Sequence, residues 1–243
     1  MEDKRLEATA RLLDVMTTLR RECPWDREQT FDSLRSNTIE ETYELADAIT
    51  DHNMEGIKEE LGDLLLHVVF YSKIGEEKEA FDFADVCTKL TDKLIYRHPH
   101  IYGNVQADTA EAVIGNWEKL KQSEKDGNKT VLGGVPKALP ALIKAERIQE
   151  KAANVGFDWE KREDVWAKVK EEVSEVEAEI EGKDDKRLEA EFGDLLFAVI
   201  NAARLYGVKP ENALEHTNRK FIDRFNYCLL YTSPSPRDRQ KSR

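Results

Sequence analysis

The chain has 243 residues, of which 40% are hydrophobic and 35% charged, and it carries a formal net charge of −12. This acidity argues against a nucleic acid partner, because phosphate backbones bind basic surfaces, although divalent cations can still join a phosphate substrate to protein carboxylates. Three scattered cysteines argue against a disulfide framework and a zinc site. The sequence also lacks the apolar run of about 18 residues that a membrane span needs, so we expect a cytoplasmic protein with no membrane partner.

The first half of the chain predicts four helices. Apolar residues recur at helical spacing from residue 4 to residue 21, and Cys23-Pro24-Trp25-Asp26 ends this first helix. A turn near Asp51-His52-Asn53 separates the next two helices, which are therefore expected to be antiparallel neighbours. The predicted ranges are 4–21, 38–50, 54–75 and 83–96.

The second half repeats this plan after a connecting region. Asp108 predicts the N-cap of a helix that runs to about Lys125, and the punctuated stretch 126–140 predicts a linker. Further helices are predicted over 139–153, 163–182, 184–206 and 209–226.

These ranges predict an organisation in two helical domains. Residues 228–243 lose the helical pattern and resemble a translated sequencing adapter, so we expect them to form a non-native tail. The predicted parts are an N-terminal domain over 1–105, a connecting helix and linker over 106–140, and a C-terminal domain over 141–227.

Two acidic motifs organise the chain, and they are copies of each other. Each is Glu-x-x-Glu followed, after one helical return, by Glu-x-x-Asp, and each acid of the first copy lies 131 residues before its counterpart. One such motif is weak evidence, but two at identical spacing predict a tandem duplication of an all-α bundle. The acids are Glu41, Glu44, Glu60 and Asp63 in the first copy, and Glu172, Glu175, Glu191 and Asp194 in the second.

The spacing of these acids predicts a metal site. Residues three apart share one helical face, so each copy places two carboxylate pairs on neighbouring helices. The helix after residue 54 is apolar nearly all round, as in a helix buried on all sides. Acids beside such a core repel one another unless a cation compensates them, and carboxylates without cysteine or a histidine pattern suit Mg²⁺, with Mn²⁺ as a substitute. For Glu40 and Glu171, a solvated acid paired with a lysine remains an open alternative.

Basic residues distinguish the two copies. Lys168, Glu172 and Glu175 fall on one helical stripe, whereas the residue 131 positions before Lys168 is Asn37. Lys168 is expected either to hold a phosphate oxygen or to form an ordinary ion pair with Glu172. The other donors predicted for phosphates are Asn218, Lys220 and Arg224 in the last helix, against Thr91, Lys93 and Arg97 in the first copy.

Further motifs resemble one family. They are similar, over about residues 5–227, to the two-domain MazG nucleoside triphosphate pyrophosphohydrolases. The residues that carry the resemblance are Cys23-Pro24-Trp25-Asp26, Thr38-Ile39-Glu40-Glu41-Thr42-Tyr43-Glu44, Glu60-Leu61-Gly62-Asp63-Leu64-Leu65, Asn116-Trp117-Glu118 and Val155-Gly156-Phe157-Asp158-Trp159.

The resemblance implies an all-α enzyme of the NTP pyrophosphohydrolase type, usually a homodimer, that converts NTPs and dNTPs to the monophosphate and pyrophosphate with Mg²⁺. It implies that the eight acids of the two motifs hold metal and that the C-terminal copy is the active one. It also implies that Lys168, Lys220 and Arg224 lie near the triphosphate.

For the mechanism we expect metal-activated water to attack the α-phosphorus in line. Glu171 or Glu175 is the candidate base, and the metal ligands are expected to be Glu172, Glu175, Glu191 and Asp194. The alternatives are a narrower enzyme for dUTP or a phosphoribosyl nucleotide, and a non-catalytic module that binds nucleotide or a partner. Large aromatics are mostly buried, so we expect core or interface anchors rather than base-stacking platforms at Trp25, Trp117 and Trp159.

Overall fold

The computed structural model describes residues 3–107, 109, 112–113, 115–117, 120, 130–182 and 184–232. Within these ranges the regular structure is helical and contains no strand, which confirms the all-α fold class. The chain divides into two compact units, Met1–Gln106 and Ala107–Arg243. The predicted N-cap at Asp108 lies outside the described residues, as do much of the helix expected to follow it, the first part of the linker and the tail beyond residue 232.

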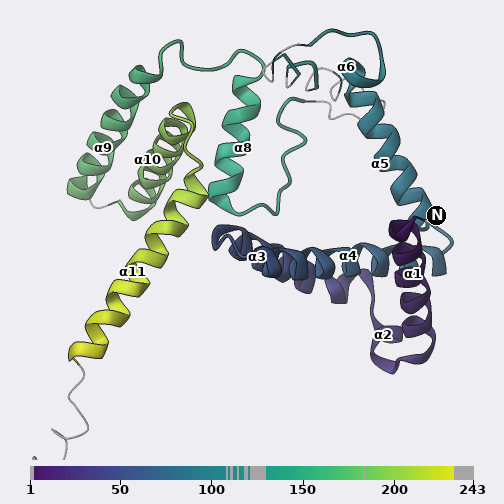
Figure 1. Ribbon diagram of the computed structural model, residues 1–243. Helices are drawn as coiled ribbons and strands as arrows, with labels where there is room; N and C mark the ends of the chain where they lie inside the picture. The colour runs from purple at the N-terminus through teal and green to yellow at the C-terminus, as the bar shows by residue number, and fades with distance from the viewer. Residues whose placement is uncertain are drawn as a thin grey trace, which may run out of the picture. The chain divides into compact units, whose positions relative to one another are not determined.

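The N-terminal unit is built on the antiparallel hairpin of α3 (Phe31–Thr50) and α4 (Met54–Glu77) (Figure 1). Asn53 caps α4, because its side-chain oxygen accepts a hydrogen bond of 3.1 Å from the backbone N–H of Gly56. The turn needs one residue with a positive φ, His52 at 53°. The other helices of the unit are α1 (Lys4–Glu22), α2 (Pro24–Glu28), α5 (Phe83–Arg97) and α6 (Pro99–Tyr102).

Helix α3 begins at Phe31, so the predicted start at Thr38 is wrong. A capping box fixes the true start: the backbone N–H of Ser33 donates to Thr30 Oγ1 at 3.1 Å, and the N–H of Thr30 donates to Ser33 Oγ at 2.9 Å. The segment after Phe31 carries few apolar residues, and of these only Leu34 is fully buried. The helical period is therefore weak there, although the cap is strong.

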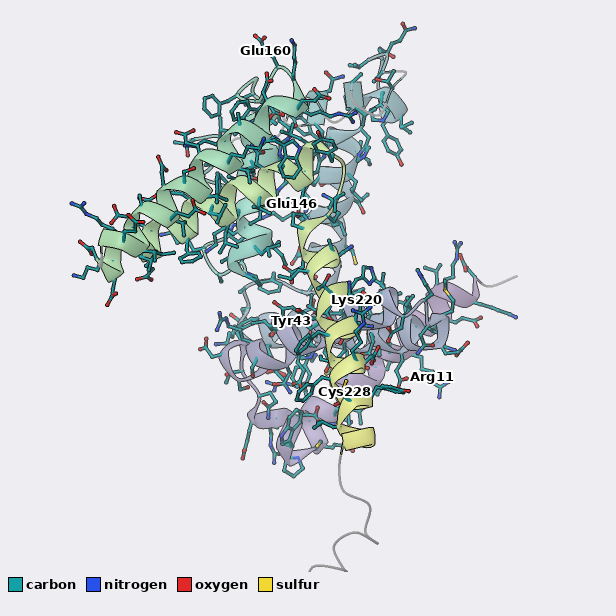
Figure 2. All side chains as sticks on the ribbon, turned by 90° about the vertical axis from the view of Figure 1, so that its left-hand side faces the viewer. Arg11, Tyr43, Glu146, Glu160, Lys220 and Cys228 are labelled. Atoms are coloured by element: carbon teal, nitrogen blue, oxygen red, sulfur yellow. The ribbon has the colours of Figure 1, made fainter. Side chains whose placement is uncertain are left out.

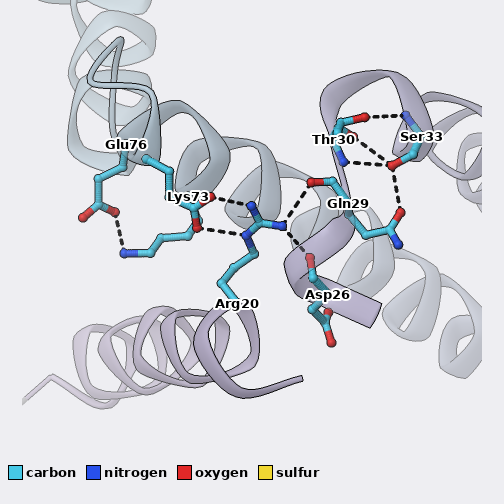
Figure 3. A network of polar contacts seen from close by, with 8 residues as sticks. Arg20, Asp26, Gln29, Thr30, Ser33, Lys73 and Glu76 are labelled. Carbon is cyan, nitrogen blue, oxygen red and sulfur yellow. Dashed lines mark hydrogen bonds and ion pairs between the residues drawn. The ribbon is translucent and has the colours of Figure 1, made fainter. Parts of the chain in front are cut away.

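Arg20 joins three segments of the N-terminal unit (Figure 3). Its guanidinium on α1 donates to the carboxylate of Glu77 on α4, with Nε 2.9 Å from Oε1, and to the backbone carbonyls of Asp26 and Gln29 around α2. It also lies 5.5 Å from the ring centre of Phe70. The Cys-Pro-Trp-Asp break is thus held against the hairpin by one buried cation. The core beside it consists of Met16, Leu34, Val69, Phe70 and Ile74.

The prediction that α4 is buried on all sides is wrong within this chain. Its core face is buried, but Leu61, Leu65 and Val68 are 52%, 44% and 42% exposed. The reason is that neighbouring helices of the unit cover only part of its circumference. None of the helices in the described ranges is long and apolar enough to cross a membrane.

The C-terminal unit repeats the hairpin with α9 (Val165–Gly182) and α10 (Asp185–Leu205), and α8 (Ala141–Ala153) packs beside it (Figure 1). A 3-10 turn at Arg162–Asp164 precedes α9. Helix α11 (Pro210–Thr232) begins against α8, where Lys209 Nζ lies 2.9 Å from carboxylate oxygens of both Glu146 and Glu150. It continues past Cys228, so the helix does not end where the sequence pattern predicted.

The duplication extends from the acids to the core of each hairpin. In α3 and α4, Thr38 Oγ1 lies 3.2 Å from His67 Nδ1 and 2.6 Å from Tyr71 Oη. The residues 131 positions later are Val169, Ala198 and Ala202, and all three are buried in the core of the second hairpin. The two copies therefore use the same positions for packing, with a polar network in one and apolar contacts in the other.

Candidate active site

Three of the four predicted acids converge on the C-terminal hairpin. Glu172 and Glu175 on α9 and Glu191 on α10 each offer a carboxylate oxygen, and these oxygens all lie within 4.8 Å of one another. We call Glu172, Glu175 and Glu191 the C-terminal acidic cluster. Glu172 is its innermost member, only 4% exposed, and its Oε2 is buried without a hydrogen-bond partner. A buried carboxylate oxygen without a partner is unfavourable unless a cation satisfies it.

Lys168 provides the compensating charge in the structure. Its Nζ lies 2.7 Å from Glu172 Oε1 and 3.3 Å from Glu171 Oε1. The hydrogen bond to Glu172 is the main cause of a raised pKa for the Lys168 ammonium. Partial desolvation raises the pKa of Glu175, although the residue is exposed, and the neighbouring Glu172 raises it further. Of the two roles predicted for Lys168, the ion pair is therefore the one present in this state.

The N-terminal hairpin forms a matching group from a different set of acids. Glu41 on α3 and Glu60 and Asp63 on α4 offer oxygens that all lie within 4.8 Å of one another, and we call them the N-terminal acidic cluster. Burial raises the pKa of Glu41, with Asp63 as the next cause, and burial also raises that of Glu60, with Glu44 next. Glu60 Oε2 is buried and has no partner.

Each copy leaves one predicted acid outside its three-residue cluster. In the N-terminal copy this is Glu44, whose charge still contributes to the raised pKa of Glu60. In the C-terminal copy it is Asp194, an exposed residue one turn beyond Glu191 on α10. The predicted quartets are therefore two trios, each with a fourth acid at its edge.

Both clusters fit a hard divalent cation. Three carboxylates within reach of one point, with one buried and unpartnered oxygen, form a donor set of the kind that Mg²⁺ and Mn²⁺ prefer. Desolvation first, and the charges of neighbouring acids second, raise the pKa values of Glu41, Glu60 and Glu175, and a bound cation would counter both effects.

The other predicted phosphate donors lie on α11, apart from the contacts of the cluster. Asn218 Nδ2 donates to Glu215 Oε2 at 3.3 Å, and Lys220 and Arg224 are exposed. Figure 2 shows Lys220 on the length of α11 that projects beyond Glu146 and α8. The first copy also has a lysine at the position matched to Lys220, because Lys89 lies 131 residues before it. The difference in basic residues between the copies is therefore smaller than predicted. Lys168 remains the clear difference between the copies.

A cavity of about 640 Å³ lies beside the C-terminal hairpin, between α8, α10 and the segment before α9. Aromatic side chains of Phe157, Trp159 and Phe197 line it. Trp159 is 40% exposed, so of the two roles predicted for it, core or interface anchor, the core role does not apply within this chain. Trp25 is likewise 58% exposed. Sequence reasoning missed this cavity because its lining combines α8, α10 and the segment before α9 with Leu132 of the preceding stretch.

Helix α10 carries residues of both the cluster and the cavity. Glu191 belongs to the cluster, and Phe197, Asn201 and Arg204 line the cavity. Phe197 is six residues beyond Glu191, which corresponds to roughly 9 Å along the axis. At about 3.6 residues per turn the two side chains leave the helix about 120° apart, so α10 carries the acid and the aromatic residue on different sides.

Comparison with known proteins places this geometry in context. The MazG nucleotide pyrophosphohydrolase domain matches the chain twice, over residues 29–102 and 160–229, and each match contains one acidic hairpin. The nucleoside triphosphate pyrophosphohydrolase of Escherichia coli (strain K12) is 45% identical over 222 residues, which cover 88% of this chain and 84% of that protein.

Two further relatives extend the comparison. The nucleoside triphosphate pyrophosphohydrolase/pyrophosphatase MazG of Thermotoga maritima is 46% identical over 217 residues, which cover 88% of this chain and 82% of that protein. The uncharacterized protein YabN of Bacillus subtilis is 46% identical over 207 residues, which cover 84% of this chain and 42% of that protein. Similarity at this level spans both hairpins and the segment between them.

Proposed function

The chain belongs to the MazG nucleotide pyrophosphohydrolase family, and on that basis we propose that it hydrolyses nucleoside triphosphates to the monophosphate and pyrophosphate. The family membership confirms the resemblance read from the sequence. We further propose that Mg²⁺ is the metal and that the reaction takes place at the C-terminal acidic cluster.

The observation that carries this proposal is the convergence of Glu172, Glu175 and Glu191 around an unpartnered buried oxygen. When bound there, a divalent cation supplies the positive charge that a triphosphate needs and makes an attached water acidic. The three carboxylates hold and orient that charge, and Asp194, one turn beyond Glu191, is the proposed fourth donor.

The remaining residues have positioning roles in this proposal. Lys168, Lys220 and Arg224, together with Asn218, supply donors for phosphate oxygens that the acids cannot bind. Glu171 or Glu175 accepts the proton of the attacking water. Glu175 suits this role because it belongs to the acidic cluster itself.

The cavity beside α10 is the proposed place for the nucleoside. Its distance along the helix from Glu191, roughly 9 Å, is of the order of a triphosphate's length. Its aromatic walls offer stacking surfaces that accept any base, so this geometry favours broad nucleotide specificity over the narrower alternatives.

We propose a homodimer, because the two hairpins expose the same apolar stripe. Leu61, Leu65 and Val68 on α4 are matched, 131 residues later, by Phe192, Leu196 and Val199 on α10, which are 46%, 60% and 44% exposed. Exposed apolar surface repeated at equivalent positions is typical of an interface. Light scattering on the purified chain tests this proposal, and a mass of one chain would contradict it.

The activity is tested by measuring pyrophosphate and monophosphate release from ATP, GTP, CTP, UTP, the dNTPs and dUTP, with and without Mg²⁺. Glu172→Ala should lower turnover by more than about 100-fold, because a direct ligand matters more than the outer partners of a metal site. Glu41→Ala, the matched change in the other cluster, should retain most of the activity. Full turnover by Glu172→Ala, or equal loss from both variants, would contradict the assignment to the C-terminal copy.

A further inference from the structure

The ion pair between Lys168 and Glu172 uses a carboxylate of the C-terminal acidic cluster. Glu172 Oε1 accepts from the Lys168 ammonium at 2.7 Å, while Glu172 Oε2 has no partner. The side chain of Glu172 is 5% exposed and that of Lys168 is 39% exposed. The lysine thus approaches an otherwise buried acid from the solvent side, so its ammonium can leave without rearrangement of the hairpin.

A metal ion held by this cluster would conflict with the ammonium. The donor oxygens of Glu172, Glu175 and Glu191 lie within 4.8 Å of one another. A dication among them would stand beside Lys168 Nζ, with no opposite charge between the two cations except the carboxylate they would share. Repulsion between close like charges is strong where water is partly excluded, and the mobile partner is the flexible lysine.

The N-terminal acidic cluster lacks this competitor. The position matched to Lys168 is Asn37, which is neutral and whose Oδ1 accepts from Ser36 Oγ at 3.2 Å. Within the described ranges, no lysine or arginine forms an ion pair with Glu41, Glu60 or Asp63. One chain therefore contains a cluster with a resident ammonium and a matched cluster without one.

We propose that Lys168 is the resident counter-ion of the C-terminal acidic cluster, that a divalent cation entering the cluster displaces its ammonium from Glu172, and that the released ammonium then binds a phosphate of the substrate. No covalent bond changes, and the lysine keeps its proton throughout. The ion pair and the phosphate contact become two successive states of one side chain. Metal binding then prepares the phosphate contact, which couples the two ligands.

The inference builds on the proposed function only in placing the metal at this cluster, and its first test needs metal alone. Full-length chain is acetylated with a lysine-reactive ester, with and without Mg²⁺ or Mn²⁺, and the rate at Lys168 is followed by peptide mass spectrometry. The rate should rise with metal, because the ammonium loses its carboxylate partners. Lys170, exposed on the same helix, is the control and should not change.

Adding inorganic triphosphate to the metal-loaded chain should lower the Lys168 rate again. A Lys168 rate that stays constant or falls when metal alone saturates the cluster would overturn the proposal. A rate that rises with metal in a preparation that hydrolyses no nucleotide would leave the displacement standing and refute the proposed function, so the two failures are distinguishable.

A second test measures Mn²⁺ affinity by electron paramagnetic resonance, with the other cluster disabled. In a Glu41→Gln background, Lys168→Met should raise the affinity of the C-terminal cluster by up to about fivefold, the upper range for a partly exposed ion pair. Lys170→Met is the matched control. In a Glu172→Gln background, Asn37→Lys should lower the affinity of the N-terminal cluster. Weaker or unchanged Mn²⁺ binding by the Lys168→Met variant, with an unchanged circular dichroism spectrum, would overturn the proposal.

Discussion

The guanidinium of Arg204, on α10, donates to the carboxylate of Asp158, 46 residues earlier in the chain, with Nη2 2.5 Å from Oδ1 and Nη1 3.1 Å from Oδ2. This contact ties the second helix of the acidic hairpin to the Phe157–Trp159 segment that walls the cavity. Arg204 also donates to Asn201, one turn earlier on the same side of α10. The position of the aromatic wall therefore depends on the helix that carries Glu191.

Replacing Arg204 should loosen that wall. Arg204→Met removes a guanidinium whose side chain is 14% exposed and leaves Asp158 with only the backbone N–H of Trp159, so it should destabilise the C-terminal unit by about 1–2 kcal/mol. If the cavity takes the nucleoside, KM should rise more than kcat falls. Urea denaturation and steady-state kinetics check the two effects. Arg162→Met, which removes an exposed arginine nearby, is the control. An unchanged KM for Arg204→Met would show that the cavity does not bind the substrate.

Arg20 has the corresponding role in the N-terminal unit. Its side chain is 8% exposed and binds Glu77 and two backbone carbonyls at once. Arg20→Met should lower the free energy of unfolding by about 2 kcal/mol, less than for a fully buried pair because Glu77 is 39% exposed. Arg20→Lys should not restore it, since an ammonium cannot match the planar fork of donors.

Urea denaturation measures this loss, and Arg21→Met provides its control. Arg21 is the next residue and is exposed, so its replacement should change stability by less than about 0.5 kcal/mol. Equal stability of the Arg20→Met and wild-type chains would show that the contacts of Arg20 do not stabilise the N-terminal unit.

The sequence predicted the repeat, the all-α class and most helices because these depend on local period and on a fixed offset of 131 residues. It did not predict the start of α3 at Phe31, where a side-chain cap rather than apolar spacing decides. The prediction that α4 is buried on all sides was wrong, because an apolar sequence predicts burial but does not show whether the same chain or a partner buries the helix. The trios, the exclusion of Asp194 and the cavity depend on side-chain directions that spacing alone leaves open.

His67 makes the N-terminal hairpin sensitive to acid. Burial lowers its pKa below the ordinary value of 6.5, although Asp63 opposes the shift. A histidine with a lowered pKa binds its proton more weakly in the folded chain, so stability should fall as the pH drops below 6.5 towards the lowered value. Thr38 and Tyr71 face the ring as neutral groups and add no charge.

Hydrogen exchange with mass spectrometry, from about pH 8 to about pH 5 with chelator present, measures this effect. Corrected for intrinsic exchange, protection of α3 and α4 should fall with pH more than protection of α9 and α10, because Ala198 replaces the histidine there. His67→Gln should reduce the difference, and His216→Gln, which changes an exposed histidine, should not. Parallel loss of protection in both hairpins would assign the acid sensitivity to another group.

The N-terminal acidic cluster predicts the opposite pH dependence for its own contribution. The raised pKa values of Glu41 and Glu60 mean that these carboxyls hold protons more tightly in the folded chain. The contribution of these two carboxyls to stability is therefore complete below pH 4.5, the ordinary pKa value. It is lost as the pH rises through the raised pKa values, where the charged acids repel one another.

At neutral pH without metal, Glu60→Gln should increase the protection of α3 and α4 from hydrogen exchange. Mg²⁺ should increase this protection in the wild-type chain but much less in the variant. Glu7→Gln, a change at an exposed residue of α1, controls for the change in net charge. If Glu60→Gln instead lowers the protection without metal, the Glu60 carboxylate stabilises the hairpin and does not repel its neighbours.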